Sequence, residues 1–253
     1  MKVTFLGTGT SQGVPVIACS CLVCSSVDFK DKRLRSAVHL QTETTSIIID
    51  IGPDFRQQVL RERIPSLDAI LLTHEHKDHT AGLDDVRSYN FKQKQHMPVY
   101  GRKQVLDQVQ NEFQYIFNGN NYPGVPRVEL QKITNHPFTI NELSIEPVEV
   151  MHYKLPVFGF KIDSFAYITD AKTISEEEKY KIKGLDVLVL NALQHNAHIS
   201  HLTLEEALEL IEELNPKKAY LTHISHNLGL AREVEQTLPE NVHLAYDGLK
   251  LTV

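Results

Sequence analysis

Tryptophan is absent from this 253-residue sequence, and cysteine occurs only three times. Three thiols in a chain of this length argue against a disulfide framework. No apolar stretch approaches the length needed to span a bilayer, and residues 1–5 enter a strand without a signal peptide. The net charge of −6 supplies no broad basic field, which argues against a nucleic-acid partner. We therefore expect a cytoplasmic protein that does not associate with membranes.

The chain does contain enough apolar residues to build a large core. Its hydrophobic content is 42%, which suits one large α/β domain or two smaller ones. No linker, low-complexity segment or internal repeat divides it. The sequence therefore predicts a single domain over residues 1–253.

Potential metal ligands are concentrated in the stretch Thr-His-Glu-His-Lys-Asp-His, residues 73–79. His74, His76, Asp78 and His79 lie within six positions, directly after the apolar run 69–72. Imidazole suits zinc, manganese, iron and other first-row ions, and a carboxylate adds an oxygen ligand. The alternative is a solvated polar loop that happens to contain histidine. Recurrence of the pattern elsewhere in the chain argues against that alternative.

The same order of residues, an apolar run, then threonine, then a ligand, returns twice. It occurs at residues 70–74, 167–170 and 220–223, with a looser version at 149–152. Strands that each end in a ligand can converge on one edge of a sheet, where open α/β folds place their sites. The resulting set of seven ligands is His74, His76, Asp78, His79, His152, Asp170 and His223.

The His-x-His-x-Asp-His motif, followed by a distant His, an Asp and a further His, resembles the metallo-β-lactamase fold superfamily of binuclear hydrolases. The resemblance implies an α/β fold, a four-layer αββα sandwich with two divalent metal ions at one edge between the sheets. It assigns His74, His76 and His152 to one ion and Asp78, His79 and His223 to the other, with Asp170 bridging them. Spacing alone indicates only that there are enough ligands for two ions. It also implies that Asp50 orients a metal-bound imidazole without being a ligand itself.

A second ligand set begins with the three cysteines, Cys19, Cys21 and Cys24. Closely spaced thiols form a soft tetrahedral set that needs a fourth partner, and His226 lies three residues after His223. We expect a closed structural zinc site that ties the N-terminal loop to the far end of the chain. The alternative is a set of reduced cysteines in a flexible loop.

The cysteine cluster narrows the resemblance to a subgroup. Cys-x-Cys-x-x-Cys after a glycine-rich loop, with Thr-His-x-Ser-His at 222–226, resembles the phosphoribosyl cyclic phosphodiesterase of the carbon–phosphorus lyase pathway and its relatives. A pyrroloquinoline-quinone biosynthesis protein has a similar cluster, so the cluster marks a subgroup and not one substrate. The glycine-rich loop, residues 7–13, fits neither nucleotide-binding fingerprint and is expected to be a tight turn near the site.

Three histidines precede the predicted helix 204–214. The segment His201-Leu202-Thr203 resembles the part of related phosphodiesterases that carries a histidine able to protonate the departing oxygen. His198, three residues earlier, is the alternative for this general acid. His195 is expected to be structural or exposed.

The predicted reaction is hydrolysis of a small phosphodiester, linear or cyclic, by a hydroxide that bridges the two ions. Asp78 would also hold this nucleophile by hydrogen bonding. Zinc and manganese both suit the ligands of the pair, and iron is not excluded. The alternative functions are a thioester or lactam hydrolase, a tRNA 3′-processing endonuclease, and a scaffold protein with a vestigial site. Related proteins suggest a homodimer.

The remaining expectations concern secondary structure. Helices are predicted over residues 54–63, 102–117, 204–214 and 230–238, with another starting near residue 80. Strands are predicted over 2–6, 37–41, 45–49 and 186–190, and two final strands are expected to close the second sheet. The loop over residues 118–126 is predicted to be a lid, a dimer contact or an ordinary surface loop.

Overall fold

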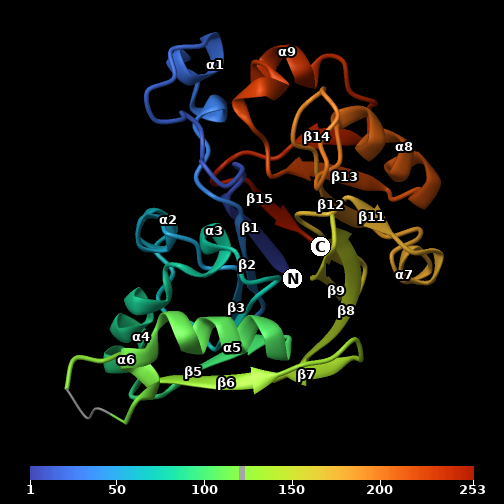
Figure 1. Ribbon diagram of the computed structural model, residues 1–253. Helices are drawn as coiled ribbons and strands as arrows, with labels where there is room; N and C mark the ends of the chain where they lie inside the picture. The colour runs from blue at the N-terminus through green and yellow to red at the C-terminus, as the bar shows by residue number, and fades with distance from the viewer. Residues whose placement is uncertain (120–122) are drawn as a thin grey trace.

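Two β-sheets form the centre of the computed structural model, which describes residues 1–119 and 123–253 (Figure 1). The first is seven-stranded. In spatial order its strands are β15 (Lys250–Thr252), β1 (Lys2–Gly7), β2 (Ala37–Gln41), β3 (Ser46–Ile49), β4 (Ala69–Leu71), β5 (Met97–Gly101) and β6 (Val128–Lys132).

The second sheet is eight-stranded. In spatial order its strands are β11 (Thr173–Ile174), β8 (Leu143–His152), β9 (Leu155–Ile162), β10 (Phe165–Tyr167), β12 (Val187–Asn191), β13 (Lys218–Thr222) and β14 (Val242–Leu244), while β7 (Phe138–Ile140) pairs with β8.

Side-chain alternation along the strands divides the core into layers. In β3, Ile47 and Ile49 pack between the two sheets, while Ile48 packs among residues of the helices outside the first sheet. The helices α2 (Phe55–Glu62), α4 (Arg87–Gln93) and α5 (Lys103–Glu112) cover that outer face, and α7 (Glu176–Lys181), α8 (Leu204–Leu214) and α9 (Ala231–Glu235) lie on the second sheet's side (Figure 1). The predicted four-layer αββα sandwich is confirmed.

Parallel pairing brings strand ends together at one edge of each sheet. In the first sheet β3, β4, β5 and β6 run parallel, and in the second β10, β12, β13 and β14 do so. The carboxyl ends of parallel strands lie at the same edge, so the residues that follow them can meet there. Asp50, His74, Asp170 and His223 each lie one to three residues beyond such an end.

Two predicted helices are interrupted. The helix predicted over 102–117 divides into α5 and α6 (Gln114–Phe117), because Phe113 leaves the helical conformation with φ −110° and ψ 40°. The helix expected near residue 80 already begins inside the metal-ligand loop as α3 (Lys77–Thr80), and a 3₁₀ turn, η2 (Leu83–Val86), separates it from α4.

One strand prediction is wrong. β15 does not close the second sheet but pairs with β1 in the first, with Lys2 opposite Thr252. The turn that precedes it is bound to β1, because Gly248 N–H donates to the Phe5 carbonyl and Phe5 N–H donates to that of Leu249. These bonds carry the chain from β14 across to the first sheet.

Part of the loop predicted over residues 118–126, namely 120–122, lies outside the described residues. Among the helices of residues 1–119 and 123–253, none is long and apolar enough to cross a bilayer.

Candidate metal centre

Three residues of the candidate site adopt left-handed backbone conformations where strands end. Asp50 follows β3 with φ 65°, Asp170 lies beyond β10 with φ 59°, and His223 follows β13 with φ 56°. Such conformations are costly for residues other than glycine and are concentrated at functional sites. Their side chains meet those of neighbouring strand ends, since Asp50 contacts His79 and Asp170 contacts His223. Gly52 permits the close packing beside them, because a Cβ there would lie 2.0 Å from the Asp78 carbonyl oxygen.

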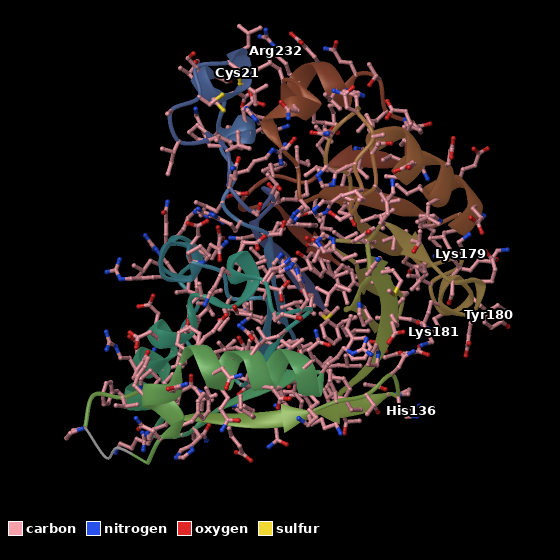
Figure 2. The ribbon with its side chains drawn as sticks, in the orientation of Figure 1. Cys21, His136, Lys179, Tyr180, Lys181 and Arg232 are labelled. Atoms are coloured by element: carbon pink, nitrogen blue, oxygen red, sulfur yellow. The ribbon has the colours of Figure 1, made fainter. Side chains whose placement is uncertain are left out.

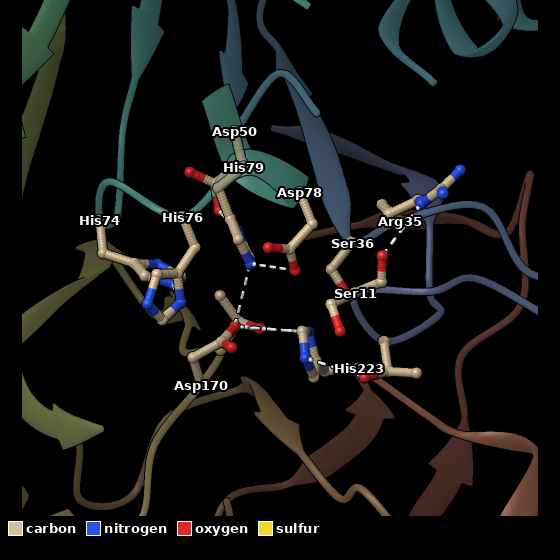
Figure 3. Close-up of polar contacts among 12 residues, drawn as sticks. Ser11, Arg35, Ser36, Asp50, His74, His76, Asp78, His79, Asp170 and His223 are labelled. Atoms are coloured by element: carbon tan, nitrogen blue, oxygen red, sulfur yellow. Dashed lines mark hydrogen bonds and ion pairs between the residues drawn. The ribbon is translucent and has the colours of Figure 1, made fainter. Parts of the chain in front are cut away.

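Asp50 is a buried anchor for the histidine loop. Its carboxylate accepts hydrogen bonds from Thr73 N–H at 2.9 Å, from the Thr73 hydroxyl at 2.9 Å, and from Nδ1 of His79 at 2.7 Å. This contact fixes the His79 ring so that Nε2 faces Asp78 at 3.1 Å and Asp170 at 3.3 Å (Figure 3). The geometry is the one expected of a carboxylate that orients a ligand.

The carboxylates around His79 favour positive charge at the centre. Burial opposes the charged form, but Asp78, Asp50 and Asp170 together raise the pKa of His79 well above its usual value. In turn, burial opposes ionisation of Asp78 and Asp170, while His79 and His223 keep the pKa of both carboxyl groups below the ordinary range. The arrangement is therefore a cluster of negative charge that attracts cations.

His74, His76 and His152 lie together on the other side of the centre. His74 Nε2 is 2.9 Å from His76 Nδ1, and burial lowers the pKa of His74 well below its usual value. The His152 ring lies 5.2 Å from that of His76, measured between centroids. Its Nδ1 donates to the backbone carbonyls of Asp170 and Ser200, so Nε2 is left for another partner.

Six of the predicted ligands, together with His201, fall into overlapping groups whose ligand atoms lie within 4.8 Å of one another. These groups are His74, His79 and Asp170, then Asp78, His79 and His223, and finally His152, Asp170 and His201. The structure thus brings together all seven side chains, with His76 joined through its contact with His74.

These residues suit divalent metal ions. The donors are imidazole nitrogens and carboxylate oxygens, the set that zinc, manganese and iron accept. Nε2 of His79 is buried between two carboxylates and has no hydrogen-bond partner of normal geometry among the described residues. An orphaned buried nitrogen is costly unless a further group satisfies it, and a cation would do so.

The three histidines before α8 lie in different environments. His201 is buried, its ring stacks on His223 with centroids 4.9 Å apart, and burial lowers its pKa to about 3. His198 is half-buried with its ring 5.0 Å from that of His201. His195 instead contacts Glu205 at 2.9 Å and the Leu228 carbonyl at 3.1 Å. This places His201 and His198 beside the centre and His195 in a separate, exposed contact.

Sequence reasoning treated the threonine before each ligand only as part of a pattern. The Thr73 hydroxyl contacts both Asp50 and His74, and the Thr169 hydroxyl donates to Asp170 at 2.7 Å. These threonines therefore hold ligands in place. The repeated Thr-ligand pair was the available signal, although sequence alone does not show where a hydroxyl points.

The three cysteines form a separate group with His226, which lies more than 200 residues later in the sequence. The Nδ1 atom of His226 lies 3.3 Å from the sulfur of Cys19, 3.4 Å from that of Cys21 and 3.5 Å from that of Cys24. Tetrahedral zinc with bonds of about 2.3 Å to sulfur and about 2.05 Å to nitrogen sets these atoms about 3.6 Å apart. The four side chains therefore have the spacing of a zinc site.

This cluster lies in a lobe that projects beside α9. The lobe carries α1 (Leu22–Ser25), and His226 opens the 3₁₀ turn η3 (His226–Leu228). Figure 2 labels Cys21 in this lobe, and the neighbouring Leu22 lines a hollow together with Arg232 of α9. Hydrogen bonds from the Cys24 N–H and His226 lower the pKa of Cys21 to about 6, whereas burial raises that of Cys24 to about 11.

Comparison with known families gives a match over most of the chain. The family model described as "Beta-lactamase superfamily domain" matches residues 45–224. A crystal structure of a new diphosphatase from the PhnP family is 39% identical, with a TM-score of 0.94, and covers 100% of this chain and 97% of that one.

Two further proteins are similar. The octanoyltransferase of Porphyromonas gingivalis is 41% identical over 100% of this chain, which covers 52% of that protein, so the chain spans about half the length of the curated relatives it matches. The zinc-bound PqqB structure from Methylobacterium extorquens has a TM-score of 0.83 at 19% identity, covers 100% of both chains, and supports the fold alone.

Proposed function

The chain belongs to the beta-lactamase superfamily, and we propose that it hydrolyses a small phosphodiester with the help of two divalent metal ions. The observation that carries this proposal is the position of His79 Nε2 between the carboxylates of Asp78 and Asp170. It joins ligands from the two sheets into one centre. The likeness to a diphosphatase at 39% identity supports a phosphate compound as the substrate class. Both comparisons support a hydrolase of the metallo-β-lactamase fold.

The proposed ligands divide into two sets that share Asp170. His74, His76 and His152, whose rings contact one another, would hold one ion. Asp78, His79 and His223, whose ligand atoms lie within 4.8 Å of one another, would hold the other. Divalent ions held by these residues would lower the pKa of a bound water towards 7 and would stabilise negative charge on the phosphate oxygens. Zinc and manganese both suit this set, since it contains no thiolate.

His201 is the residue we propose to protonate the leaving oxygen. Its Nδ1 is buried without a hydrogen-bond partner in the described part of the chain, 3.8 Å from Asp170. Burial keeps the ring neutral, but a phosphodiester anion beside it would favour the imidazolium. A positioned general acid contributes roughly 10²–10⁴-fold to the rate. His198, which lies beside His201, is the alternative proton donor.

A structural zinc ion at Cys19, Cys21, Cys24 and His226 is part of the proposal. The sulfur-to-nitrogen spacing supports it, as does the position of the cluster between the N-terminal lobe and η3. Three thiolates favour zinc much more strongly than manganese. Such an ion would brace the lobe against the wall of the metal centre.

Hydrolysis of an acyl thioester is the second candidate function. The relative from Porphyromonas gingivalis is named for transfer of an octanoyl group, and it matches the whole of this chain. Water activated by such ions would be able to attack a carbonyl carbon as well as phosphorus. However, this chain matches only about half of that relative, so the named activity can belong to its other half.

Substrate profiling of the metal-loaded protein distinguishes the candidates. The panel would contain a cyclic phosphodiester, a linear diester, a diphosphate diester, an octanoyl thioester, nitrocefin and a short RNA. We expect turnover of the three small phosphate compounds to exceed that of the octanoyl thioester, nitrocefin and the RNA. Preferential thioester cleavage would overturn the proposed substrate class but not the metal centre, and failure to bind two ions per chain outside the cysteine cluster would overturn the mechanism.

A further inference from the structure

Arg33 is a buried cation outside the metal centre. Only 4% of the residue is exposed, and its Nη1 donates to the Thr8 hydroxyl at 2.8 Å and to the Ala245 carbonyl at 2.6 Å. Its guanidinium makes its hydrogen bonds to the described residues through Nη1, so the N–H groups of Nε and Nη2 are left for another acceptor. Burial lowers the pKa of Arg33 to about 10, which still leaves the guanidinium charged at neutral pH.

This charge has no direct counter-ion. Among the described residues no carboxylate forms an ion pair with the guanidinium, although Asp247, Asp31 and Glu235 favour its charge from a distance. Their oxygens already accept hydrogen bonds from other groups, which are the Thr8 hydroxyl for Asp247 and backbone N–H groups for the other two. A buried charge without a partner is costly, and an anion from outside the chain would supply one.

Arg33 lines a cavity of about 260 Å³ between residues 28–33 and α9. Lys30 and Arg232 line the same cavity. The Nζ atom of Lys30 lies 5.1 Å from the centre of the Tyr246 ring, a cation–π contact that holds the ammonium group beside the cavity. Arg232 is exposed on α9 (Figure 2). Three cations, one of them buried, therefore surround one small cavity.

Two carboxylates also line the cavity, and both already serve the fold. Asp28 accepts a hydrogen bond from Lys30 N–H at 3.0 Å. Glu235 accepts one from Leu244 N–H at 2.8 Å and contacts Nδ1 of His243 at 3.1 Å. The cations thus outnumber the carboxylates and keep free donors. The seven proposed ligands of the metal centre do not line this cavity, so it is a separate site.

We infer that this cavity binds a small phosphate dianion, with Arg33 at its base and Lys30 and Arg232 at its rim. A guanidinium presents paired N–H groups that match two phosphate oxygens. Three cations attract a dianion more strongly than a monocarboxylate. The cavity is smaller than the about 300–1,000 Å³ of pockets for drug-sized ligands, so the ligand would be inorganic phosphate or a compact phosphate monoester. The inference does not depend on the metal pair of the proposed function.

The absence of tryptophan from the chain allows a reporter at this cavity. Tyr246→Trp places a single tryptophan in the lining, and tryptophan is the best cation–π partner for Lys30. The metal-loaded protein would be titrated with inorganic phosphate, glycerol phosphate and acetate at constant ionic strength. We expect a saturable fluorescence change with one or both phosphate compounds and much weaker binding of acetate. The tighter of the two phosphate compounds would identify the ligand as the free ion or an ester. Tyr180→Trp, exposed on α7, is the control reporter and should show no saturable change.

Substitutions in the Tyr246→Trp protein test each cation. Arg33→Met should raise the Kd for phosphate by about 10–100-fold, the range for a hydrogen bond to a charged group. Lys30→Ala and Arg232→Ala, at the rim, should each raise it about two- to fivefold, as for exposed ion pairs. Arg56→Ala removes an exposed arginine of α2 and should leave the Kd unchanged. The two rim variants decide the question if Arg33→Met does not fold.

Calorimetry of the wild type and Arg232→Ala makes the same comparison without a reporter. Phosphate held by the metal ions would not respond to Arg232→Ala, so failure of this site and failure of the proposed function are distinguishable. The inference is overturned by the absence of saturable binding of both phosphate compounds, by acetate binding as tightly as they do, or by an unchanged Kd in both rim variants.

Discussion

Nδ1 of His79 lies 2.7 Å from Oδ2 of Asp50, and both side chains are completely buried. Asp50 follows β3, whereas His79 lies in the loop and short helix after β4, so the contact joins two neighbouring strand ends. It determines which ring nitrogen of His79 faces the other carboxylates. The orientation of one predicted ligand therefore depends on a carboxylate that is not itself a ligand.

The first prediction concerns this carboxylate. Asp50→Asn keeps the shape but removes the charge, and the amide can no longer accept from both Thr73 and His79 with the same strength. We expect the affinity of the catalytic pair for Mn²⁺ to fall by about 10–100-fold, measured by chelator competition.

A matched control is Asp68→Asn. Asp68 accepts a hydrogen bond from Ser46 N–H at the far end of β3, away from the histidines. This variant should leave the Mn²⁺ affinity unchanged. Equal losses in the two variants would show that the effect of Asp50→Asn is general destabilisation and not ligand orientation.

The second prediction concerns pH and a histidine outside the metal centre. Burial, with help from the charge of Lys2, lowers the pKa of His39 to about 4, and its Nε2 lies 2.8 Å from the Ser46 hydroxyl. Between the ordinary histidine pKa of about 6.5 and about 4, the unfolded chain binds a proton that the folded chain excludes. Stability should therefore rise with pH across this window and fall as the pH drops.

Urea unfolding of the metal-free protein at pH 7 and pH 4.5 would measure this effect. We expect His39→Gln to reduce the loss on acidification by about 2–3 kcal/mol, the free energy of a shift of about two pH units. The exposed His96→Gln is the control and should leave the pH dependence unchanged. Parallel pH profiles for wild type and His39→Gln would contradict the prediction.

The third prediction concerns the cysteine cluster. Cys21→Ser should lower the zinc content by one ion per chain and lower the Tm, because zinc would join the lobe to η3. Metal analysis of the purified protein and thermal unfolding would check both. Ser20→Ala, at an exposed neighbouring position, should change neither. A Cys21→Ser protein that retains its zinc and its Tm would rule out a structural zinc site.

The sequence was most informative where a local pattern coincides with a strand end. Apolar runs followed by Thr and a ligand marked β4, β10 and β13, and parallel pairing then brings those ends to one edge. The helix α8 was predicted with its observed bounds because its apolar positions repeat at helical spacing and Thr203 caps it through Glu206.

The sequence was least informative where distant contacts decide the structure. The destination of β15 depends on bonds between Phe5 and the turn at 248–249, which no local pattern encodes. The break at Phe113 lies within an apolar stripe that continues through it.

The last prediction separates the three histidines before α8. A p-nitrophenolate group leaves without a proton, whereas an alkoxide leaving group needs one. His201→Ala should therefore lose much more activity on an alkyl diester than on bis(p-nitrophenyl) phosphate. We expect a loss of roughly 10²–10⁴-fold on the alkyl ester. His195→Ala should lose neither activity, because the His195 ring makes its hydrogen bonds to Glu205 and the Leu228 carbonyl, away from the metal centre. Equal losses on both substrates in His201→Ala would refute proton donation by His201, and a selective loss in His198→Ala would assign that step to His198.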